Sequence, residues 1–214
     1  MKRLVIKVGT AVLTQDGQLA IERMENLVDL IAKLKNEKKL EVILVSSGAV
    51  GAGYTTLKLD KKIIANKQAL AAIGQPLLLK HYKKRFKEHN ISCAQMLFIA
   101  DDFDSRKRTK NAQDVMEILL ENKILPIINE NDVIANYELL FGDNDQLAAH
   151  VAFHFKADML AILSDIDGYY NKNPREFDDA VLQKEVSFID PSELQMTHTA
   201  NSEFATGGIV TKLK

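Results

Sequence analysis

Residues 124–132 read Ile-Leu-Pro-Ile-Ile-Asn-Glu-Asn-Asp, an apolar run that ends abruptly in amides and acids. The apolar half has the length and composition of a strand that is buried on both faces. The polar half is poor packing material, but it suits the carboxyl end of a core strand, where α/β proteins bind ligands. A second acid–amide cluster, residues 142–145, precedes a helical pattern. The two clusters predict a site between a strand end and a helix entry.

Apolar runs and helical patterns alternate along the whole chain. Because strands that alternate with helices pair in parallel, we predict an α/β fold in which helices cover both faces of a parallel sheet. Residues 136–141, between the two clusters, are expected to form a short hairpin arm. The predicted strands are residues 3–8, 42–45, 93–99, 124–128 and 159–163. The predicted helices are residues 22–35, 61–88 with an interruption at Gly74 and Pro76, 107–121 with Val115, Ile118 and Leu119 on one face, and 144–155.

Composition narrows the class of protein. The 214 residues, 46% of them hydrophobic, suit one domain with a substantial core. A formal net charge of −1 argues against a general nucleic-acid binder, which usually carries a basic excess. The single cysteine, Cys93, excludes an internal disulfide and fits a reducing cytosol. The sequence shows no signal peptide and no membrane-spanning stretch, so we expect a cytoplasmic protein with no nucleic-acid or membrane partner.

Polar residues and glycines also follow the other predicted strands. Lys7 lies inside an apolar strand, two residues before Gly9. This lysine either extends its head to water from a strand end or reaches an anion beside exposed backbone N–H groups. Ser46-Ser47-Gly48 and Ser164-Asp165 end two further strands. Since the carboxyl ends of parallel strands share one edge of a sheet, we expect these residues to gather there.

Two glycine-rich stretches offer backbone N–H groups without matching a known nucleotide-binding motif. Gly48, Gly51 and Gly53 have the spacing G-x-x-G-x-G, which differs from the dinucleotide fingerprint. They permit close approach of a ligand or close packing of a helix, and the sequence leaves both open. Residues 206–212 place a glycine pair before a threonine and a lysine, groups that a phosphate requires, although the spacing is not that of a P-loop.

Simpler interpretations compete with a functional one. Asp143 or Asn144 could cap the helix that follows, although capping does not account for both acid–amide clusters. His150 and His154 lie four residues apart but lack the glutamate of the H-E-x-x-H zinc signature. We therefore interpret these histidines as packing residues and expect no metal site built from protein ligands alone.

Taken together, these stretches resemble the amino acid kinase family, and within it the branch whose members phosphorylate the side-chain carboxylate of L-glutamate. The motifs occur in the family's order and cover nearly the whole chain. Ser-Ser-Gly-Ala together with Asn-Glu-Asn-Asp distinguishes this branch. The matching stretches are residues 5–10, 45–50, 128–132, 142–145, 164–165 and 206–212.

The resemblance implies a three-layer α/β/α sandwich with a mainly parallel central sheet. It also implies transfer of phosphate from ATP, with Mg²⁺ bound together with ATP, to give L-glutamyl 5-phosphate, the first intermediate towards proline. The catalytic residues would be Lys7 and Lys212, which contact the ATP phosphates, and Asp145, which orients both lysines.

The resemblance likewise assigns the binding residues. Ser47, Asp132 and Asn144 would bind glutamate. The nucleotide site would include Lys7, Gly9, Thr10, Ser164, Asp165, Thr206, Gly207, Gly208, Ile209, Val210, Thr211 and Lys212.

Further expectations follow from the same resemblance. We expect one kinase domain over residues 1–214 that is incomplete at its C-terminal part and lacks the RNA-modification-type (PUA) domain of many family members. The expected partners are L-glutamate, proline as a feedback inhibitor, and further copies of the chain in a homo-oligomer.

Three other functions stay open. The chain could be a family member that acts on acetylglutamate, carbamate, aspartate or UMP, a non-catalytic nucleotide or amino-acid sensor, or a Rossmann oxidoreductase. Ser47 in its Ser-Ser-Gly context argues against the first. The intact set of lysines and aspartates argues against the second, and the failed glycine spacing argues against the third.

Overall fold

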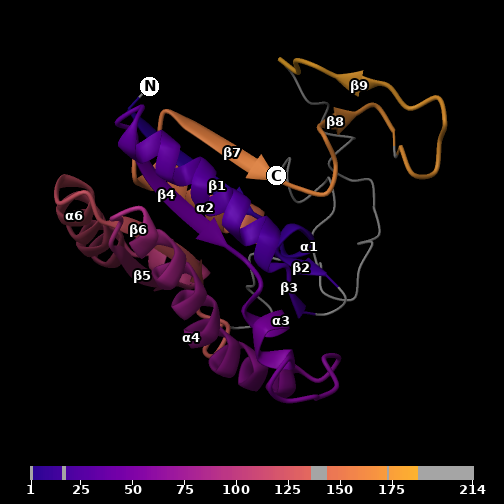
Figure 1. Ribbon diagram of the computed structural model, residues 1–214, viewed down its shortest axis with the longest axis horizontal. Coiled ribbons are helices and arrows are strands. Elements are labelled where there is room, and N and C mark those ends of the chain that lie inside the picture. Colours follow the sequence, from indigo (N-terminus) through magenta and orange to yellow (C-terminus); the bar gives the residue numbers. More distant parts are fainter. Residues whose placement is uncertain (1, 16–17, 136–143, 173, 188–214) are drawn as a thin grey trace.

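A five-stranded parallel sheet with the strand order β5-β6-β4-β1-β7 forms the centre of the computed structural model (Figure 1). The structure describes residues 2–15, 18–135, 144–172 and 174–187. All five predicted strands are confirmed, with small shifts at their ends. They are β1 (Arg3–Val8), β4 (Glu41–Ser46), β5 (Cys93–Phe98), β6 (Leu125–Glu130) and β7 (Met159–Leu163).

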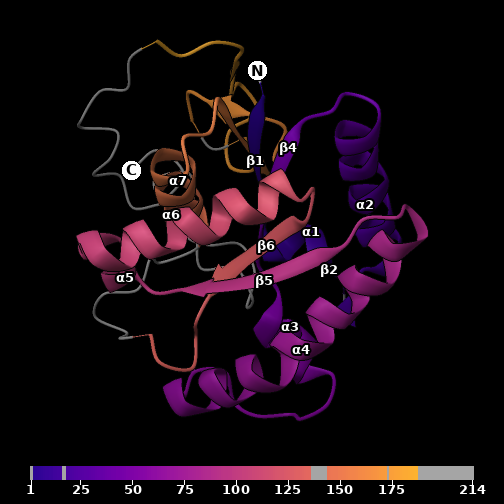
Figure 2. The same ribbon diagram turned by 90° about the vertical axis from the view of Figure 1, so that its left-hand side faces the viewer.

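Helices cover both faces of this sheet, so the predicted three-layer α/β/α sandwich is confirmed (Figure 2). The longer helices are α2 (Ile21–Asn36), α4 (Ile64–Glu88), α6 (Arg106–Glu121) and α7 (Asn144–His154). The short helices are α1 (Thr10–Leu13), α3 (Ala49–Tyr54) and α5 (Ala100–Asp104). Two small antiparallel pairs lie outside the central sheet: β2 (Thr14–Gln15) with β3 (Gln18–Leu19), and β8 (Tyr169–Tyr170) with β9 (Leu182–Gln183).

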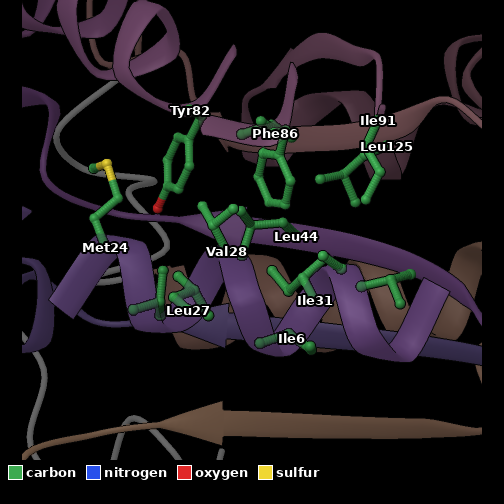
Figure 3. Packing of buried hydrophobic residues seen from close by; sticks show 14 of the residues in the cluster. Ile6, Met24, Leu27, Val28, Ile31, Leu44, Tyr82, Phe86, Ile91 and Leu125 are labelled. Carbon is green, nitrogen blue, oxygen red and sulfur yellow. The ribbon is translucent and has the colours of Figure 1, made fainter. Parts of the chain in front are cut away.

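Alternating side chains of the strands divide the core into two clusters. Ile6 of β1 packs with α2 and α4 on one face, where Figure 3 shows Tyr82 and Phe86 pointing from α4 toward Leu44 of β4. Val5 of β1 packs with α5, α6 and α7 on the opposite face. Because successive residues of a strand point to opposite faces, this pattern decides which helix each strand-end residue meets.

Helix α4 continues through Gly74 and Pro76, so the predicted interruption is wrong. A proline inside a helix removes one backbone hydrogen bond and crowds the preceding turn. Here the helix is supported along its length by buried side chains, among them Leu70, Leu78 and Tyr82. Tertiary packing therefore outweighs the local preference of the chain to break.

Helices α3 and α4 cross in backbone contact. A Cβ atom at Gly74 would lie 1.8 Å from the carbonyl oxygen of Ala49, and one at Gly53 would lie 1.9 Å from the carbonyl oxygen of Leu70. The close-packing interpretation is thus confirmed for Gly53. Gly48, just before α3, has φ of 104°, a left-handed conformation that only glycine adopts without strain.

The predicted helix over residues 107–121 is present as α6, but its buried face differs from the expected one. Thr109, Met116 and Leu120 are buried, whereas Val115 is 48% exposed and Ile118 is 59% exposed. Successive residues of a helix lie 100° apart, so Val115 and Met116 belong to two neighbouring faces of α6. The apolar pattern alone does not decide which of these faces is buried.

Within the described ranges, no helix is long and apolar enough to cross a membrane.

Substitution of Gly74 by alanine should destabilise the fold strongly. The new methyl group would overlap a backbone carbonyl, which cannot move without separating α3 from α4. We expect a loss of about 3 kcal/mol in the free energy of unfolding, measured by denaturant titration. Gly51→Ala is the matched control, because its methyl group would meet only the Thr14 side chain at 3.2 Å. Equal stability of the two variants would contradict this account of the crossing.

Candidate active site

The carboxyl ends of β6, β4, β1 and β7 lie next to one another in that order. The motifs singled out from sequence lie in the last residues of these four strands or directly after them: residues 129–132, residues 46–48, residues 7–10 and residues 164–165. The chain passes from β1 to β4 on one side and returns to β7 on the other side of β1. Such a switch in direction leaves a crevice at the strand ends, and open α/β sheets bind ligands there.

Backbone hydrogen bonds fix the loops after these strands against one another. The N–H group of Ser47 donates to the carbonyl oxygen of Val8 at 3.2 Å. The N–H group of Gly9 donates to the carbonyl oxygen of Leu163 at 3.2 Å, immediately before Ser164. The end of β1 and the loop after it therefore connect the predicted glutamate-binding residue Ser47 with the predicted nucleotide-binding residues after β7.

Lys7 and Asp145 form a buried ion pair at the centre of this edge. Nζ of Lys7 contacts Oδ1 of Asp145, and the two side chains are only 5% and 1% exposed. Lys7 meets α7 because it shares the strand face of Val5, which packs against that helix. The interpretation of Lys7 as a lysine whose head reaches water is therefore wrong. Its Nζ also lies 3.7 Å from the place of a Cβ at Gly9, so the charge lies beside the loop.

Asn144, the first residue of α7, connects the ends of β4 and β6. The paired register between these two strands stops before Ser46. Beyond this point Nδ2 of Asn144 donates to the carbonyl oxygen of Ser46 at 3.0 Å, to Oγ of Ser47 at 3.1 Å and to Oδ1 of Asn129 at 2.7 Å. The side chain of Asn144 thus joins the ends of β4 and β6 beyond their paired register.

Sequence reasoning missed the supports beneath these residues. Nδ2 of Asn129 donates to Oε1 of Gln75 on α4 at 2.8 Å. The hydroxyl of Ser46 forms a 2.9 Å hydrogen bond with the hydroxyl of Tyr82, also on α4, and burial raises the pKa of this tyrosine. The only sequence signal for Gln75 is its place between Gly74 and Pro76, a pair that is typical of a helix break.

Asp132 lies just beyond β6, half-buried at the rim of the site. Burial raises the pKa of its carboxyl group to about 6, although the nearby Lys67 ammonium acts in the opposite direction. A carboxylate in this environment gains most from a cationic partner, because a nearby positive charge favours its ionised form.

Ser164 and Asp165 follow β7 next to the Gly9 loop. Arg175, which sequence reasoning did not select, donates to Oδ2 of Asp165 at 2.8 Å, and this bond lowers the pKa of the carboxyl group. The hydroxyl of Ser164 donates to the other carboxylate oxygen at 3.2 Å. Thr10 begins α1, and its carbonyl oxygen accepts a 2.8 Å hydrogen bond from the Thr14 hydroxyl. The nucleotide-binding roles of these residues stay predictions.

Several predicted elements lie outside the described residues. They are the arm over residues 136–141, Gly142, Asp143, and the stretch from Thr206 to Lys212 that includes Gly207, Gly208, Ile209, Val210 and Thr211.

The packing interpretation of the histidine pair agrees with the structure. The rings of His150 and His154 stack on Phe103, with ring centroids 5.2 and 5.1 Å away. In the part of the chain that the structure describes, no group of three or more histidine, cysteine, aspartate or glutamate residues could hold a metal ion.

The sequence from residue 2 to residue 214 matches the model of the amino acid kinase family. The chain belongs to this family. Glutamate 5-kinase from Wolinella succinogenes is 56% identical over the whole chain, which covers 83% of that protein. Glutamate 5-kinase from Leishmania donovani is 53% identical over the whole chain, which covers 81% of that protein.

Solved structures of two other kinases share the fold. A structure of isopentenyl phosphate kinase matches 90% of this chain and 84% of its own, with a TM-score of 0.61 and 14% identity. UMP kinase from Ureaplasma parvum matches 85% of this chain and 74% of its own, with a TM-score of 0.58 and 18% identity. At these identities the likeness concerns the fold alone.

Replacement of Asp145 by asparagine should destabilise the protein, because the buried Lys7 ammonium would face a neutral amide. Loss of one partner of a buried ion pair costs about 3 kcal/mol or more, which denaturant titration can measure. The double variant Lys7→Met/Asp145→Asn should recover part of this loss, since the charge is then absent as well. Additive losses in the double-mutant cycle would show that the two residues are not coupled.

Proposed function

We propose that this chain is a glutamate 5-kinase, which transfers the γ-phosphoryl group of ATP to the side-chain carboxylate of L-glutamate. The products are ADP and L-glutamyl 5-phosphate, and the reaction is the first step of proline biosynthesis. One observation supports this most strongly: the identity of 56% with a glutamate 5-kinase extends over the whole chain. The buried pair of Lys7 and Asp145 at the switch point of the sheet is consistent with a phosphotransferase that acts on a carboxyl group.

The chemistry requires charge neutralisation more than acid–base catalysis. A carboxylate oxygen forms a bond to the γ-phosphorus while the bond to the β-phosphate oxygen breaks, so two anions must approach each other. The glutamate carboxyl group, with an ordinary pKa of about 4.3, is already ionised at neutral pH and needs no general base. Positive charge and precise positioning then supply most of the rate enhancement.

In this proposal Lys7 supplies charge to the ATP phosphates. Its Nζ lies beside the Gly9 loop, whose backbone can come close to a phosphate, and Asp145 holds the ammonium in place. Lys212, a predicted second cation, and the glycine pair before it would add to the same site. Mg²⁺ would arrive with ATP and be held mainly by phosphate oxygens and water, as is usual for an ion that dehydrates reluctantly.

The amino-acid substrate would lie at the β4 and β6 end of the crevice. Asp132 would pair with its ammonium group, and Ser47 and Asn144 would hydrogen-bond its polar groups. The order of the strands places this region on one side of β1 and the Ser164 loop on the other side. The carboxylate and the γ-phosphate would then meet above β1, next to Lys7.

The proposal also covers location, regulation and assembly. An ATP-dependent biosynthetic enzyme with one cysteine fits the cytoplasm, where thiols stay reduced. Inhibition by proline and assembly into a homo-oligomer are expectations from the family. Initial rates with added proline and sedimentation velocity of the purified protein test them.

A substrate panel tests the function directly. With MgATP and L-glutamate, the protein should form an acyl phosphate that hydroxylamine traps as a hydroxamate. N-acetylglutamate, aspartate, carbamate and UMP serve as competing substrates in parallel reactions. Turnover of one of these without turnover of glutamate would reject the substrate assignment.

Lys7→Ala should lower kcat for glutamate phosphorylation by ~10²-fold or more, the scale of losing one charge contact in the transition state. Lys2→Ala is the matched control, because Lys2 is an exposed lysine at the opposite end of β1 and should keep the wild-type kcat. Steady-state kinetics at saturating ATP and glutamate measure both variants, and an unchanged kcat in Lys7→Ala would remove this lysine from the mechanism.

The affinity for glutamate should depend on the ionisation of Asp132. Because the pKa of this carboxyl group is raised to about 6, protonation below that pH removes the charge that holds the substrate's ammonium group. We expect kcat/KM for glutamate to fall as the pH decreases through about 6. This midpoint lies well above the pKa of the substrate's side-chain carboxyl group, which is about 4.3. Asp132→Asn should show a high KM for glutamate at every pH and lack this midpoint. The same midpoint in Asp132→Asn would assign the titration to another group.

A further inference from the structure

The orientation of the Asn144 amide follows from its neighbours. The carbonyl oxygen of Ser46 can only accept a hydrogen bond, so the Asn144 atom 3.0 Å from it must be the donor Nδ2. This Nδ2 also lies 2.7 Å from a side-chain atom of Asn129, which must then be the acceptor Oδ1. The N–H group of Glu130 donates to the same Oδ1 at 3.0 Å and supports this assignment independently.

The direction of hydrogen-bond donation continues from Asn129 to helix α4. With its Oδ1 accepting from Asn144, Asn129 directs Nδ2 toward Gln75 and donates to Oε1 at 2.8 Å. Gln75 is half-buried and belongs to the turn of α4 that includes Gly74, where α4 touches the backbone of α3. The acceptor at Gln75 is therefore held in place by the helix crossing. A chain of amides thus runs from α4 through β6 to the first residue of α7.

This chain of amides leaves one atom of Asn144 for a ligand. The two protons of Nδ2 are shared among three acceptors, Ser46, Ser47 and Asn129. None of the hydrogen bonds within the described residues uses Oδ1 of Asn144. With its donor side occupied, the amide can offer a substrate only the acceptor Oδ1, which suits an ammonium group.

We propose that Gln75 is a positioning residue for the amino-acid subsite: its Oε1 fixes the Asn129 amide, which in turn holds Asn144 with its acceptor oxygen toward the substrate's ammonium group. The inference rests on the proposed function for the identity of the substrate. Gln75 acts through two other side chains and needs no contact with the substrate. Its loss should therefore weaken binding of the amino acid and leave the nucleotide site and the transfer step unchanged.

The test compares one variant that removes the acceptor with one that keeps it. Gln75→Met is similar in size to glutamine but cannot accept from Asn129, whereas Gln75→Glu keeps an acceptor oxygen at the same place. We expect Gln75→Met to raise the KM for glutamate about tenfold, the scale of one buried hydrogen bond, with kcat and the KM for ATP within about twofold of the wild type. Gln75→Glu should stay within about threefold of the wild type in all three constants.

The control variant is Gln95→Met. Gln95 is an exposed residue of β5 that accepts a long 3.5 Å hydrogen bond from the other end of Gln75, the Nε2 group, and it should have no effect on the KM. A wild-type KM in Gln75→Met would overturn the proposal. Equal defects in Gln75→Met and Gln75→Glu would also overturn it, because the acceptor would then not be the cause. Parallel changes in kcat and in both KM values, with a lower melting temperature, would indicate a general structural defect and reject the positioning role.

A second measurement does not depend on the identity of the substrate. In ¹⁵N NMR spectra of the whole chain, the side-chain amide protons of Asn144, assigned by their absence in Asn144→Asp, should exchange slowly with solvent. They should exchange at least severalfold faster in Gln75→Met than in Gln75→Glu. Unchanged exchange in Gln75→Met would reject the proposal even if the protein turned over another amino acid, whereas absence of glutamate turnover by the wild type would reject only the proposed function.

Discussion

A lysine ammonium group buried inside a parallel sheet must have a partner, because an isolated charge in this environment is very unfavourable. Lys7 meets this requirement through Asp145, and the pair connects the central strand β1 with the start of α7. The same helix start carries Asn144, which joins β4 to β6. The ion pair and the amide together fix α7 over the carboxyl ends of three strands, and this arrangement creates the candidate active site.

Helix α4 supports the same edge from the opposite face of the sheet. Gly53 and Gly74 let α3 and α4 approach to backbone contact, which no residue with a Cβ atom would allow. This approach brings Tyr82 beneath Ser46 and Gln75 beneath Asn129. The strand-end residues Ser46 and Asn129, which lie next to the expected amino-acid subsite, are therefore held by side chains of α4. A site assembled in this way can keep its geometry before the substrate binds.

Much of the fold was predictable because the local signals agreed with the tertiary structure. All five central strands are short apolar runs, and such runs are typical of strands that are buried on both faces. The failures have physical causes. Gly74 and Pro76 resemble a helix break because local preference takes no account of the packing that stabilises α4. On α6, Met116 and not Val115 or Ile118 faces the core, because the position of the sheet selects one of two neighbouring apolar faces.

The sequence by itself determined the α/β class, the family resemblance and the strand-end motifs, because these depend on the order and spacing of residues along the chain. Only the tertiary structure decided how the motifs combine. It showed that Lys7, which the resemblance places with Asp145, is buried and does not extend to water, and that Asn144 joins the ends of two strands. Gln75 is 54 positions away from Asn129 in the sequence, and no local pattern links the two. Their contact arises from the crossing of α3 and α4, since only the folded chain brings that turn of α4 to the end of β6.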